Sequence, residues 1–304
     1  MGDKLQHEFA PLISVVMPVY NSAVYLSEAI ESVLNQTLSD FELIIIYDKS
    51  NDDSIAIINQ YLQNDSRVKL IYGNNEKLIG ALNQGINEAR GKFIARMDAD
   101  DISLPERFEK QVKLMELVGA DICGCNLLVI NESGKLVDAK IMPSSCETFI
   151  ICLACTVPFA HGSVMMRSSF VKMHALRYGG AKYAEDYELW IRFYERNAIF
   201  ANVNEFLFKY RDTDVSLMKQ VGKQNQSETR NLNRVFVSCN SVACIDALGV
   251  LANQYPTLSL AERDLVLLAS YIALITFKSA IFFTLVRKSS FRSIGKLMIY
   301  LLNR

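Results

Sequence analysis

Three carboxylates crowd the end of an apolar segment of this sequence. Asp98, Asp100 and Asp101 directly follow the run Phe93-Ile94-Ala95 and its continuation Arg96-Met97. Carboxylates at this density repel one another, and their pKa values rise unless a cation or hydrogen-bond donors compensate the charge. A hard divalent cation, which prefers oxygen ligands, is a natural compensator. The segment is therefore a candidate metal site, and the alternative is a solvated turn ahead of the next helix.

Polar and aromatic residues also follow the first two apolar segments of the chain. Pro18, Tyr20 and Asn21 close the first segment, and Asp48 ends the second. Ligands of open α/β sheets gather beyond the carboxyl ends of the strands. Because the first turn has no glycine-rich phosphate loop, such a pocket would hold a base and leave the phosphates to a metal. The Asp48 carboxylate could accept a hydrogen bond from the N3–H of uracil. The alternatives are that Tyr20 packs, Asn21 caps a helix and Asp48 lies in a solvated turn.

A second acidic pair precedes a helical pattern much later in the chain. Glu185 and Asp186 stand before the apolar spacing that contains Trp190. An aspartate with its ordinary pKa of about 3.9 is ionised at neutral pH and can act as a general base. The alternative is helix capping, because acids in a first helical turn interact favourably with the helix dipole. Further on, Arg211 supplies either a cation that could meet a diphosphate or a solvated charge.

The first half of the chain alternates short β-rich segments with helical patterns. This order predicts an α/β fold in which helices flank a mostly parallel, Rossmann-like central sheet. Gly91 follows a helical pattern and is expected to end that helix as a C-terminal glycine cap. The expected strands are Ile13–Val19, Leu43–Ile46, Val68–Tyr72, the segment that begins at Phe93, and Asp121–Ile130.

Long helical stretches replace this pattern beyond about Ser216, which predicts a C-terminal helical appendage. From Leu265 to Arg304 the chain has no Asp or Glu, but it has Lys and Arg among Leu, Ile and Phe. A basic, apolar helix is attracted to an anionic membrane surface. Lys278 interrupts the run Leu265 to Val286, which favours a helix on the surface over one that spans the bilayer. Helix packing or an oligomer contact is the remaining alternative.

The composition is that of an ordinary globular protein. The 304 residues are 50% hydrophobic, and 32 basic residues against 33 acidic ones give a net charge of -1. This charge balance gives no indication of a nucleic-acid partner. The seven cysteines, an odd number in apolar surroundings, fit a reducing compartment, and the N-terminus has no signal-peptide pattern. We therefore expect a cytoplasmic protein.

The chemical segments, in this order, resemble the family 2 nucleotide-sugar glycosyltransferases of the GT-A fold. The resemblance covers roughly residues 12 to 217 and is closest to bacterial enzymes that build surface polysaccharide or lipooligosaccharide. It implies a GT-A catalytic domain over residues 1–217. The helical region over residues 218–304 lies outside the resemblance, and its basic, apolar pattern alone makes it a candidate for membrane association. The segments that carry it are Ser14 to Asn21, the strand ending in Asp48, Asp98-Ala99-Asp100-Asp101, and Glu185-Asp186 with Trp190.

The resemblance assigns roles on the donor side of the site. It implies that Asp48 binds the uracil and that Asp100 ligates Mn²⁺ or Mg²⁺ on the donor diphosphate. Asp98 would contact the ribose or the metal. The other implied donor-binding positions are Pro18, Tyr20, Asn21 and Arg211.

The resemblance also assigns the acceptor side. Asp186 matches the family's base, which takes the proton from the acceptor hydroxyl while the configuration at the sugar is inverted. Glu185, Trp190 and His161 would face the acceptor or the donor sugar.

The implied activity is inverting, metal-dependent transfer of a sugar (GlcNAc, GalNAc, Gal or Glc) from a UDP-sugar to a hydroxyl of a growing, lipid-linked surface glycan. The enzyme would work at the inner face of the cell membrane, with no nucleic-acid partner, as a monomer or an oligomer. Two alternatives stay open. A sugar nucleotidyltransferase also combines a nucleotide-binding half-sheet with acids that bind metal, but it typically has a Gly-rich basic loop where this chain has Tyr20-Asn21-Ser22. A non-catalytic family member that binds nucleotide or serves as a scaffold is the other.

Four positions depart from the family's pattern. Tyr47 and Lys49 flank Asp48 where the family commonly has Asp-Asp-Gly-Ser, so one acid is lost and a glycine gives way to a residue that adopts positive φ less readily. Leu82 and Thr213 stand where many members have a basic residue and a histidine. These departures put the shape of the nucleotide loop and two phosphate or metal contacts in doubt.

Overall fold

The computed structural model describes residues 10–74, 76–213 and 222–240, together with residues 243, 244, 246, 247 and 250. The chain divides into two compact units. The first contains residues 1–140, 160–179 and 196–213, and the second contains residues 141–159, 180–195 and 214–304. This division differs from the expected boundary between residues 217 and 218, because the chain leaves the first unit after residues 140 and 179, returns each time, and leaves it again after residue 213.

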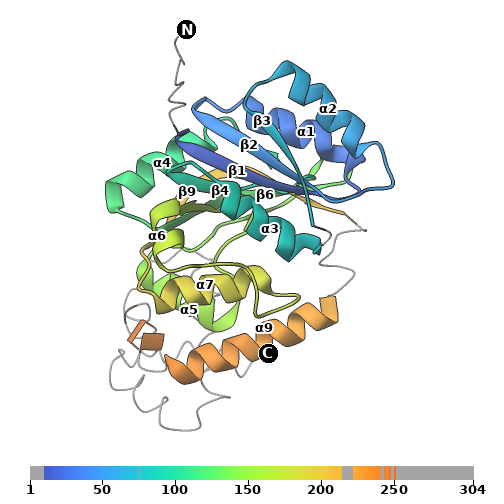
Figure 1. The fold of residues 1–304 in the computed structure, drawn as a ribbon. Coiled ribbons are helices and arrows are strands. Elements are labelled where there is room, and N and C mark those ends of the chain that lie inside the picture. Colours follow the sequence, from blue (N-terminus) through green and yellow to red (C-terminus); the bar gives the residue numbers. More distant parts are fainter. Residues whose placement is uncertain are drawn as a thin grey trace. The chain divides into compact units, whose positions relative to one another are not determined.

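One sheet of nine strands forms the first unit, with the order β3-β2-β1-β4-β8-β6-β9-β5 and with β7 paired to β6 (Figure 1). Parallel pairs join β1 to β2, β1 to β4, β2 to β3, and β6 to β9. The short strands β5 and β8, and the hairpin strand β7, are antiparallel to their neighbours. The strands are β1 (Ile13–Val19), β2 (Phe41–Tyr47), β3 (Val68–Tyr72), β4 (Phe93–Arg96), β5 (Ile102–Ser103), β6 (Ile122–Asn131), β7 (Leu136–Lys140), β8 (Met165–Arg167) and β9 (Phe200–Asp212).

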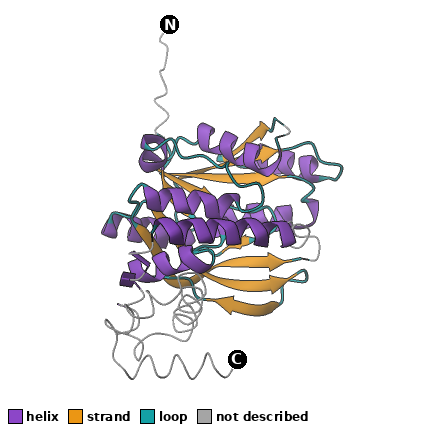
Figure 2. Ribbon diagram, turned by 90° about the horizontal axis from the view of Figure 1, so that it is seen from below, coloured by secondary structure: helices purple, strands orange, loops and turns teal. Residues whose placement is uncertain are grey.

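Helices connect and cover these strands, and Figure 2 shows them in purple against the orange strands. Helix α3 packs on β1 and β2, α4 packs on β6 and β9, and α1 lies beside α2. The α/β fold predicted from the sequence is confirmed, and antiparallel strands extend its parallel part. The helices of this unit are α1 (Ala23–Leu34), α2 (Ser54–Asn64), α3 (Lys77–Glu88), α4 (Arg107–Val118), α6 (Ser168–Met173) and the 3₁₀ turn η1 (His161–Ser163).

The parallel strands form where the sequence is continuously apolar. All seven residues of β2 are buried, as are six of the seven in β1. Continuous rather than alternating burial is typical of parallel strands that are covered on both faces. At the start of β2 the buried Glu42 is compensated by Ser14 at 2.6 Å and by Lys69 at 2.6 Å. At this position the core accommodates a buried charge because several partners compensate it.

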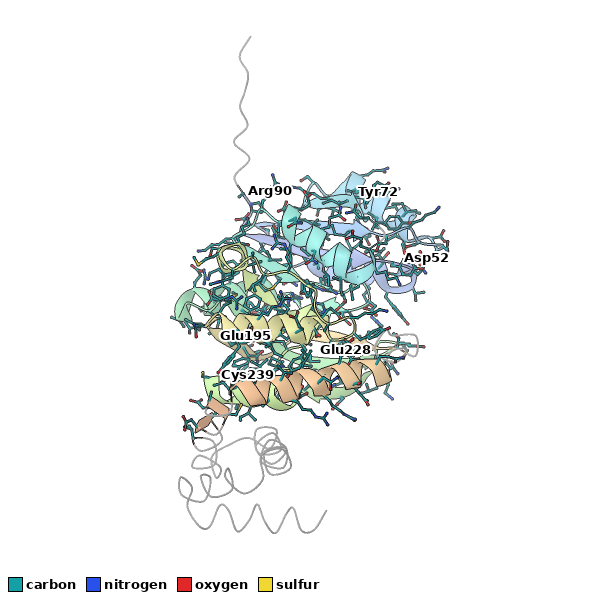
Figure 3. All side chains as sticks on the ribbon, turned by 60° about the horizontal axis from the view of Figure 1, so that its bottom comes forward. Asp52, Tyr72, Arg90, Glu195, Glu228 and Cys239 are labelled. Carbon is teal, nitrogen blue, oxygen red and sulfur yellow. The ribbon has the colours of Figure 1, made fainter. Side chains whose placement is uncertain are left out.

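The parallel register brings three strand ends to one edge of the sheet. Val19 pairs with Tyr47, and Tyr47 pairs with Tyr72, so β1, β2 and β3 end level with one another. Figure 3 shows Asp52 and Tyr72 at this end of the first unit and Arg90 at the opposite end. The residues that follow these strands are consequently neighbours, which is the geometry that a ligand site of an open α/β sheet requires.

The expected glycine cap at Gly91 is wrong. Helix α3 ends at Glu88, and its cap residue Ala89 is extended, with φ -66° and ψ 122°. Gly91 lies beyond the helix, where its backbone presses against β1: an added Cβ would lie 2.5 Å from the Ser14 nitrogen and 2.7 Å from the Ile13 carbonyl carbon. The glycine serves close backbone approach instead of helix termination.

The second unit is helical in its described part and comprises α5 (Cys146–Cys155), α7 (Glu185–Glu195) and α9 (Gly222–Cys239). Glu228 and Cys239 mark α9 in Figure 3. Trp190 of α7 is completely buried and packs edge-on against Phe159 at 5.9 Å. Helix α9 agrees with the helical pattern expected after residue 218. The basic segment from Leu265 to Arg304 lies outside the described residues.

No helix within the described ranges is both long enough and apolar enough to cross a membrane.

Replacing Gly91 with alanine is expected to destabilise the protein by about 1 to 3 kcal/mol, because the new methyl group meets backbone atoms of β1 that cannot rotate away. Chemical denaturation monitored by circular dichroism measures the change. Gly222→Ala, at the first residue of α9 where an added Cβ meets nothing within 4 Å, is the matched control and is expected to be neutral or slightly stabilising. Equal effects of the two substitutions would contradict the assignment of Gly91 to close packing.

Candidate functional site

The loops after β1 and β2 are bonded to each other at the shared strand edge. The Asn21 amide donates to the Ser50 hydroxyl at 3.0 Å, and the Asn51 amide donates to the Asn21 side-chain oxygen at 2.9 Å. Asn21 has a positive φ of 49°, a conformation that asparagine adopts more readily than most residues. Tyr20 stands beside it with an exposed side chain. The structure thus brings together the two turns that the sequence assigns to a base pocket, and Pro18 lies half-buried near the end of β1.

Asp48 is a buried acceptor at this edge of the sheet. Its amide donates to the carbonyl of Val19, and its side chain is only 9% exposed. The Oδ1 atom is buried and has no hydrogen-bond partner among the residues that the structure describes. Gly73 leaves room for it, because an added Cβ there would lie 2.0 Å from Oδ1. Buried acceptors are normally satisfied, so this oxygen is suited to a donor supplied by a ligand.

The two departures beside Asp48 have structural explanations. The Tyr47 hydroxyl accepts the Ser50 amide at 3.1 Å, and its ring meets the Tyr72 ring edge-on at 6.1 Å. Lys49 does not have a positive φ, so the loop contains no strain at the position where the family has glycine. The loop therefore closes around Asp48 by a different set of contacts.

The acid loop, Asp98 to Asp101, connects β4 to β5 and contains three carboxylates in different surroundings. Asp98 is 32% exposed and forms an ion pair of 2.5 Å with the buried guanidinium of Arg96. Asp101 is 1% exposed, and its Oδ1 accepts the Arg211 amide at 2.7 Å. The other Asp101 oxygen, Oδ2, is buried and has no partner in the described part of the chain. Asp100 is intermediate in exposure.

The charge of this loop is incompletely compensated. Burial, and then the charge of Asp98, raises the pKa of Asp100 to about 6. Burial and the charges of Asp98 and Asp100 raise the pKa of Asp101 well above its ordinary value. Tyr210 is affected in the same direction, because burial and the neighbouring Asp101 raise the pKa of its hydroxyl. The cluster therefore favours an added positive charge.

Two buried arginines lie under the acid loop. Arg96 donates to the carbonyl of Met97 in addition to Asp98, and Arg107 donates to the carbonyl of Arg96 at 2.7 Å. Burial lowers the pKa of Arg107 to about 10, which leaves the residue charged at neutral pH. Neither arginine was predicted from the sequence. For Arg96 the available signal was a charged residue at the last position of an otherwise apolar strand, because such a charge must have a partner.

The acid loop fits a divalent cation that shares its ligands with a substrate. In the described part of the chain, no three His, Cys, Asp or Glu side chains converge on one point. Mg²⁺ is usually bound by one or two carboxylates together with phosphate oxygens rather than by an all-protein cage. Asp100 and the partly exposed Asp98 match that arrangement, and the raised pKa of Asp100 indicates the missing charge. Their assignment as ligands stays a prediction.

His161 and Gly162 lie against the acid loop from another part of the first unit. A Cβ on Gly162 would lie 2.7 Å from Oδ2 of Asp98 and 3.1 Å from Oδ2 of Asp101. The His161 ring contacts the Tyr178 hydroxyl at 2.8 Å through Nε2. Burial, and then the charge of Arg96, lowers the pKa of His161 well below its ordinary value, so the ring is neutral at pH 7. The structure thus places His161 beside the acid loop, and its expected contact with a sugar stays a prediction.

Arg211 has contacts that the sequence did not indicate. Its side chain is 2% exposed, Nε donates to the carbonyl of Asp100 at 2.8 Å, and a terminal nitrogen is ion-paired with Glu28. The guanidinium stacks over the Tyr25 ring at 4.3 Å. The expected role as a diphosphate cation requires an available guanidinium, whereas this one is already bonded to the protein.

The acidic pair Glu185-Asp186 opens α7 in the second unit. Glu185 is 9% exposed, and an oxygen of Asp186 accepts the Tyr187 amide at 2.7 Å, so both residues lie in the first helical turn. Trp190, on the next turn, has no exposed surface. That burial does not fit the expected contact of Trp190 with a sugar or an acceptor, and the ring serves as packing for α7.

The remaining departures lie in the interior. Leu82 of α3 is 1% exposed, and Thr213, which follows β9, is 3% exposed. Because both side chains are buried, neither takes the place of the phosphate or metal contact that a basic residue or a histidine would make there.

The sequence and the fold both match known proteins. Residues 14–173 match the family model described as Glycosyl transferase family 2. EpsE of Bacillus subtilis (strain 168), named as a glycosyltransferase, is 38% identical over 209 residues, which cover 66% of this chain and 73% of that protein. The O-antigen biosynthesis glycosyltransferase WbnJ of Escherichia coli is 35% identical over 211 residues, covering 68% and 82% of the two chains.

Two solved structures share the fold. S. aureus TarS 1-349 in complex with UDP-GlcNAc has a TM-score of 0.60 at 18% identity, over 86% of this chain and 80% of that one. The mannosyltransferase PcManGT from Pyrobaculum calidifontis, in complex with GDP-Man and Mn²⁺, has a TM-score of 0.54 at 14% identity, over 92% and 87%. At such identities the likeness concerns the fold alone, and it agrees with the expected GT-A architecture.

In the absence of divalent cations, Asp100→Asn is expected to stabilise the protein at pH 8 by about 1 to 3 kcal/mol, because one pKa unit corresponds to 1.36 kcal/mol. The folded carboxyl has its pKa at about 6 against an ordinary value of 3.8. The folded state therefore binds more protons between these values, and wild-type stability falls as the pH rises from 3.8 to about 6. The asparagine variant lacks this fall.

Urea unfolding at pH 4, 6 and 8 with a chelator present measures the effect. Asp138→Asn, the same change at an exposed position of β7, is the control and is expected to shift stability by less than about 0.5 kcal/mol. A less stable Asp100→Asn protein at pH 8 would contradict the description of the loop as undercompensated.

Proposed function

Because the chain belongs to glycosyl transferase family 2, we propose that it transfers a sugar from a UDP-sugar to a hydroxyl group, with inversion and with the help of Mn²⁺ or Mg²⁺. The observation that carries the proposal is the pairing of two features in the first unit. The buried Oδ1 of Asp48 is free to receive a donor, and the acid loop favours a cation. A nucleoside diphosphate presents both complements, a base N–H and a charged diphosphate that binds metal.

The residues of the first unit would act on the donor. Asp48 accepts the N3–H of uracil, with Tyr20 and Asn21 beside the ring. Asp100 and Asp98 hold the cation, which when bound neutralises charge on the departing diphosphate. The UDP and UDP-GlcNAc complexes of TarS support a uridine donor, and the Mn²⁺ complex of PcManGT supports a divalent metal.

Asp186 is the proposed base. It takes the proton of the acceptor hydroxyl while that oxygen attacks the anomeric carbon from the side opposite the diphosphate. The bond from the anomeric carbon to the diphosphate oxygen breaks, its electron pair leaves with UDP, and the configuration inverts. An ordinary carboxylate pKa suffices for this role at neutral pH. Glu185 and His161 are proposed to contact the acceptor or the donor sugar.

The acceptor is proposed to be a growing surface glycan, lipid-linked, and the transferred sugar GlcNAc, GalNAc, Gal or Glc. The similarity to WbnJ, which is named as an O-antigen biosynthesis glycosyltransferase, supports a bacterial surface glycan. The basic segment from Leu265 to Arg304 supports a peripheral position at the inner face of the cell membrane.

A panel of sugar nucleotides tests the proposal. With Mn²⁺ or Mg²⁺, at least one UDP-sugar is expected to be hydrolysed slowly to UDP and free sugar, and EDTA is expected to abolish the reaction. Asp186→Asn should lower transfer to an acceptor by at least about 100-fold, the effect of a lost general base, while UDP binding stays within about twofold. Release of UDP without any metal requirement would contradict the metal dependence, and hydrolysis of only GDP-sugars would contradict a uridine donor.

A further inference from the structure

The Arg211 guanidinium is bonded on every side within the first unit. Nε donates to the Asp100 carbonyl at 2.8 Å, one terminal nitrogen donates to the carbonyls of Asn131 and Glu132 at 3.4 and 3.3 Å, and the other pairs with Glu28. Tyr25 covers one face of the group. A diphosphate would have to displace the Glu28 carboxylate in order to reach it.

Arg211 bonds both Asp100 and Asp101, the last two residues of the acid loop. Its side chain holds Asp100 by the main-chain carbonyl, and its own amide holds Asp101 by the carboxylate at 2.7 Å. A planar guanidinium that bonds several carbonyls at once sets an orientation that a flexible point charge cannot set. Arg211 thereby restrains the main chain that carries the Asp100 carboxylate.

Glu28 connects this arrangement to the nucleotide side of the sheet edge. It lies on α1, whose first residue, Ala23, donates its amide to Asp52 at 2.9 Å in the loop that follows Asp48. The preceding Ser22 amide donates to the hydroxyl of Ser54 at 3.0 Å, at the start of α2 directly after that loop. Helix α1 is therefore bonded at its start to the base-pocket loops and one turn later to Arg211.

We propose that Arg211 and Glu28 are positioning residues that fix the distance and direction between the base pocket and the metal ligand Asp100. Helix α1 would keep the position of Asp48 fixed relative to that of Asp100. A single nucleoside diphosphate could then place its base near Asp48 and its diphosphate at the cation held by Asp100. This inference rests on the proposed function, and it replaces the direct diphosphate contact expected of Arg211 by an action through the acid loop.

Glu28→Gln is the test variant, because Glu28 is 55% exposed and its loss leaves α1 attached to the rest of the unit. The helix keeps the bond from the Ser103 amide to Ser32 at 3.0 Å and the bonds of Gln36 to the β5 segment. The matched control is Glu31→Gln, which removes the same charge from the same helix at an exposed residue that contacts Tyr61.

Isothermal titration of the full chain with Mn²⁺ alone, UDP alone, and UDP in saturating Mn²⁺ gives the readout. In the wild type, Mn²⁺ is expected to strengthen UDP binding. In Glu28→Gln this enhancement is expected to fall about 10-fold, within the usual range of coupling between two sites, and Mn²⁺ alone is expected to bind more weakly than to the wild type. UDP affinity without metal should stay within about twofold, and the Tm close to that of Glu31→Gln. Glu31→Gln should retain the full enhancement.

Arg211→Lys separates positioning from charge. Lysine keeps the charge but not the planar set of donors, so positioning predicts loss of the enhancement, whereas a direct diphosphate contact predicts that it is largely kept. The inference is overturned if Glu28→Gln keeps both its Mn²⁺ affinity and its enhancement, or if it binds UDP more tightly without metal because Arg211 has been released. Absence of UDP binding in the wild type overturns the proposed function instead, and the Mn²⁺ titration still decides the inference. If the wild type binds neither UDP nor Mn²⁺, both are overturned.

Discussion

At the end of β4 the side chain of Asp101 lies inside the protein, while Asp98 and Asp100 place two more carboxylates in the same turn. Charges buried at this spacing repel one another, and they persist only where the surroundings supply cations or donors. Arg96 supplies one counter-charge and the Arg211 amide supplies one donor. The balance stays negative, as the raised pKa values show. The uncompensated charge lowers the stability of the folded chain, and perturbed pKa values of this kind cluster at functional sites.

Near Asp48, and again at the acid loop, a glycine makes room for a carboxylate group. Gly73 gives the Asp48 carboxylate its space, and Gly162 lets the 3₁₀ turn lie against Asp98. In each case a side chain on the glycine would displace a carboxylate oxygen. Within the described ranges, Oδ1 of Asp48 and Oδ2 of Asp101 have no hydrogen-bond partner, so these buried acceptors remain unsatisfied there.

The parallel half of the sheet could be predicted from the sequence because its signals are local. Continuous apolar runs gave the strands, and Ile13–Val19 and Val68–Tyr72 were predicted at the bounds that the structure has. Strand β8 has three residues and β5 has two, so neither shows a recognisable period, and both exist through long-range antiparallel pairing. The prediction for Gly91 was wrong because the sequence shows only that the residue is glycine. A glycine can end a helix or allow a close backbone contact, and the sequence does not distinguish the two.

The candidate site could be predicted to a similar extent. Acids at strand ends are visible in sequence, and Asp48 and Asp98 to Asp101 were found in that way. The partners of Arg211 were not, since the residue that restrains it, Glu28, is distant in sequence and belongs to an ordinary amphipathic helix. Only three-dimensional contacts show which residue of a buried cluster is bonded within the protein and which is available to a ligand. The burial of Trp190 is another example.

A crystal structure of the full chain with UDP and Mn²⁺, with the metal located by its anomalous scattering, tests the central claim most directly. The account predicts Mn²⁺ at about 2.1 Å from a carboxylate oxygen of Asp100 and bonded to the diphosphate, a distance typical of such small hard cations. It also predicts the uracil N3 within about 2.7 to 3.2 Å of the Asp48 carboxylate, as in an ordinary hydrogen bond. A metal bound away from both Asp98 and Asp100, with the diphosphate held by other residues, would contradict it.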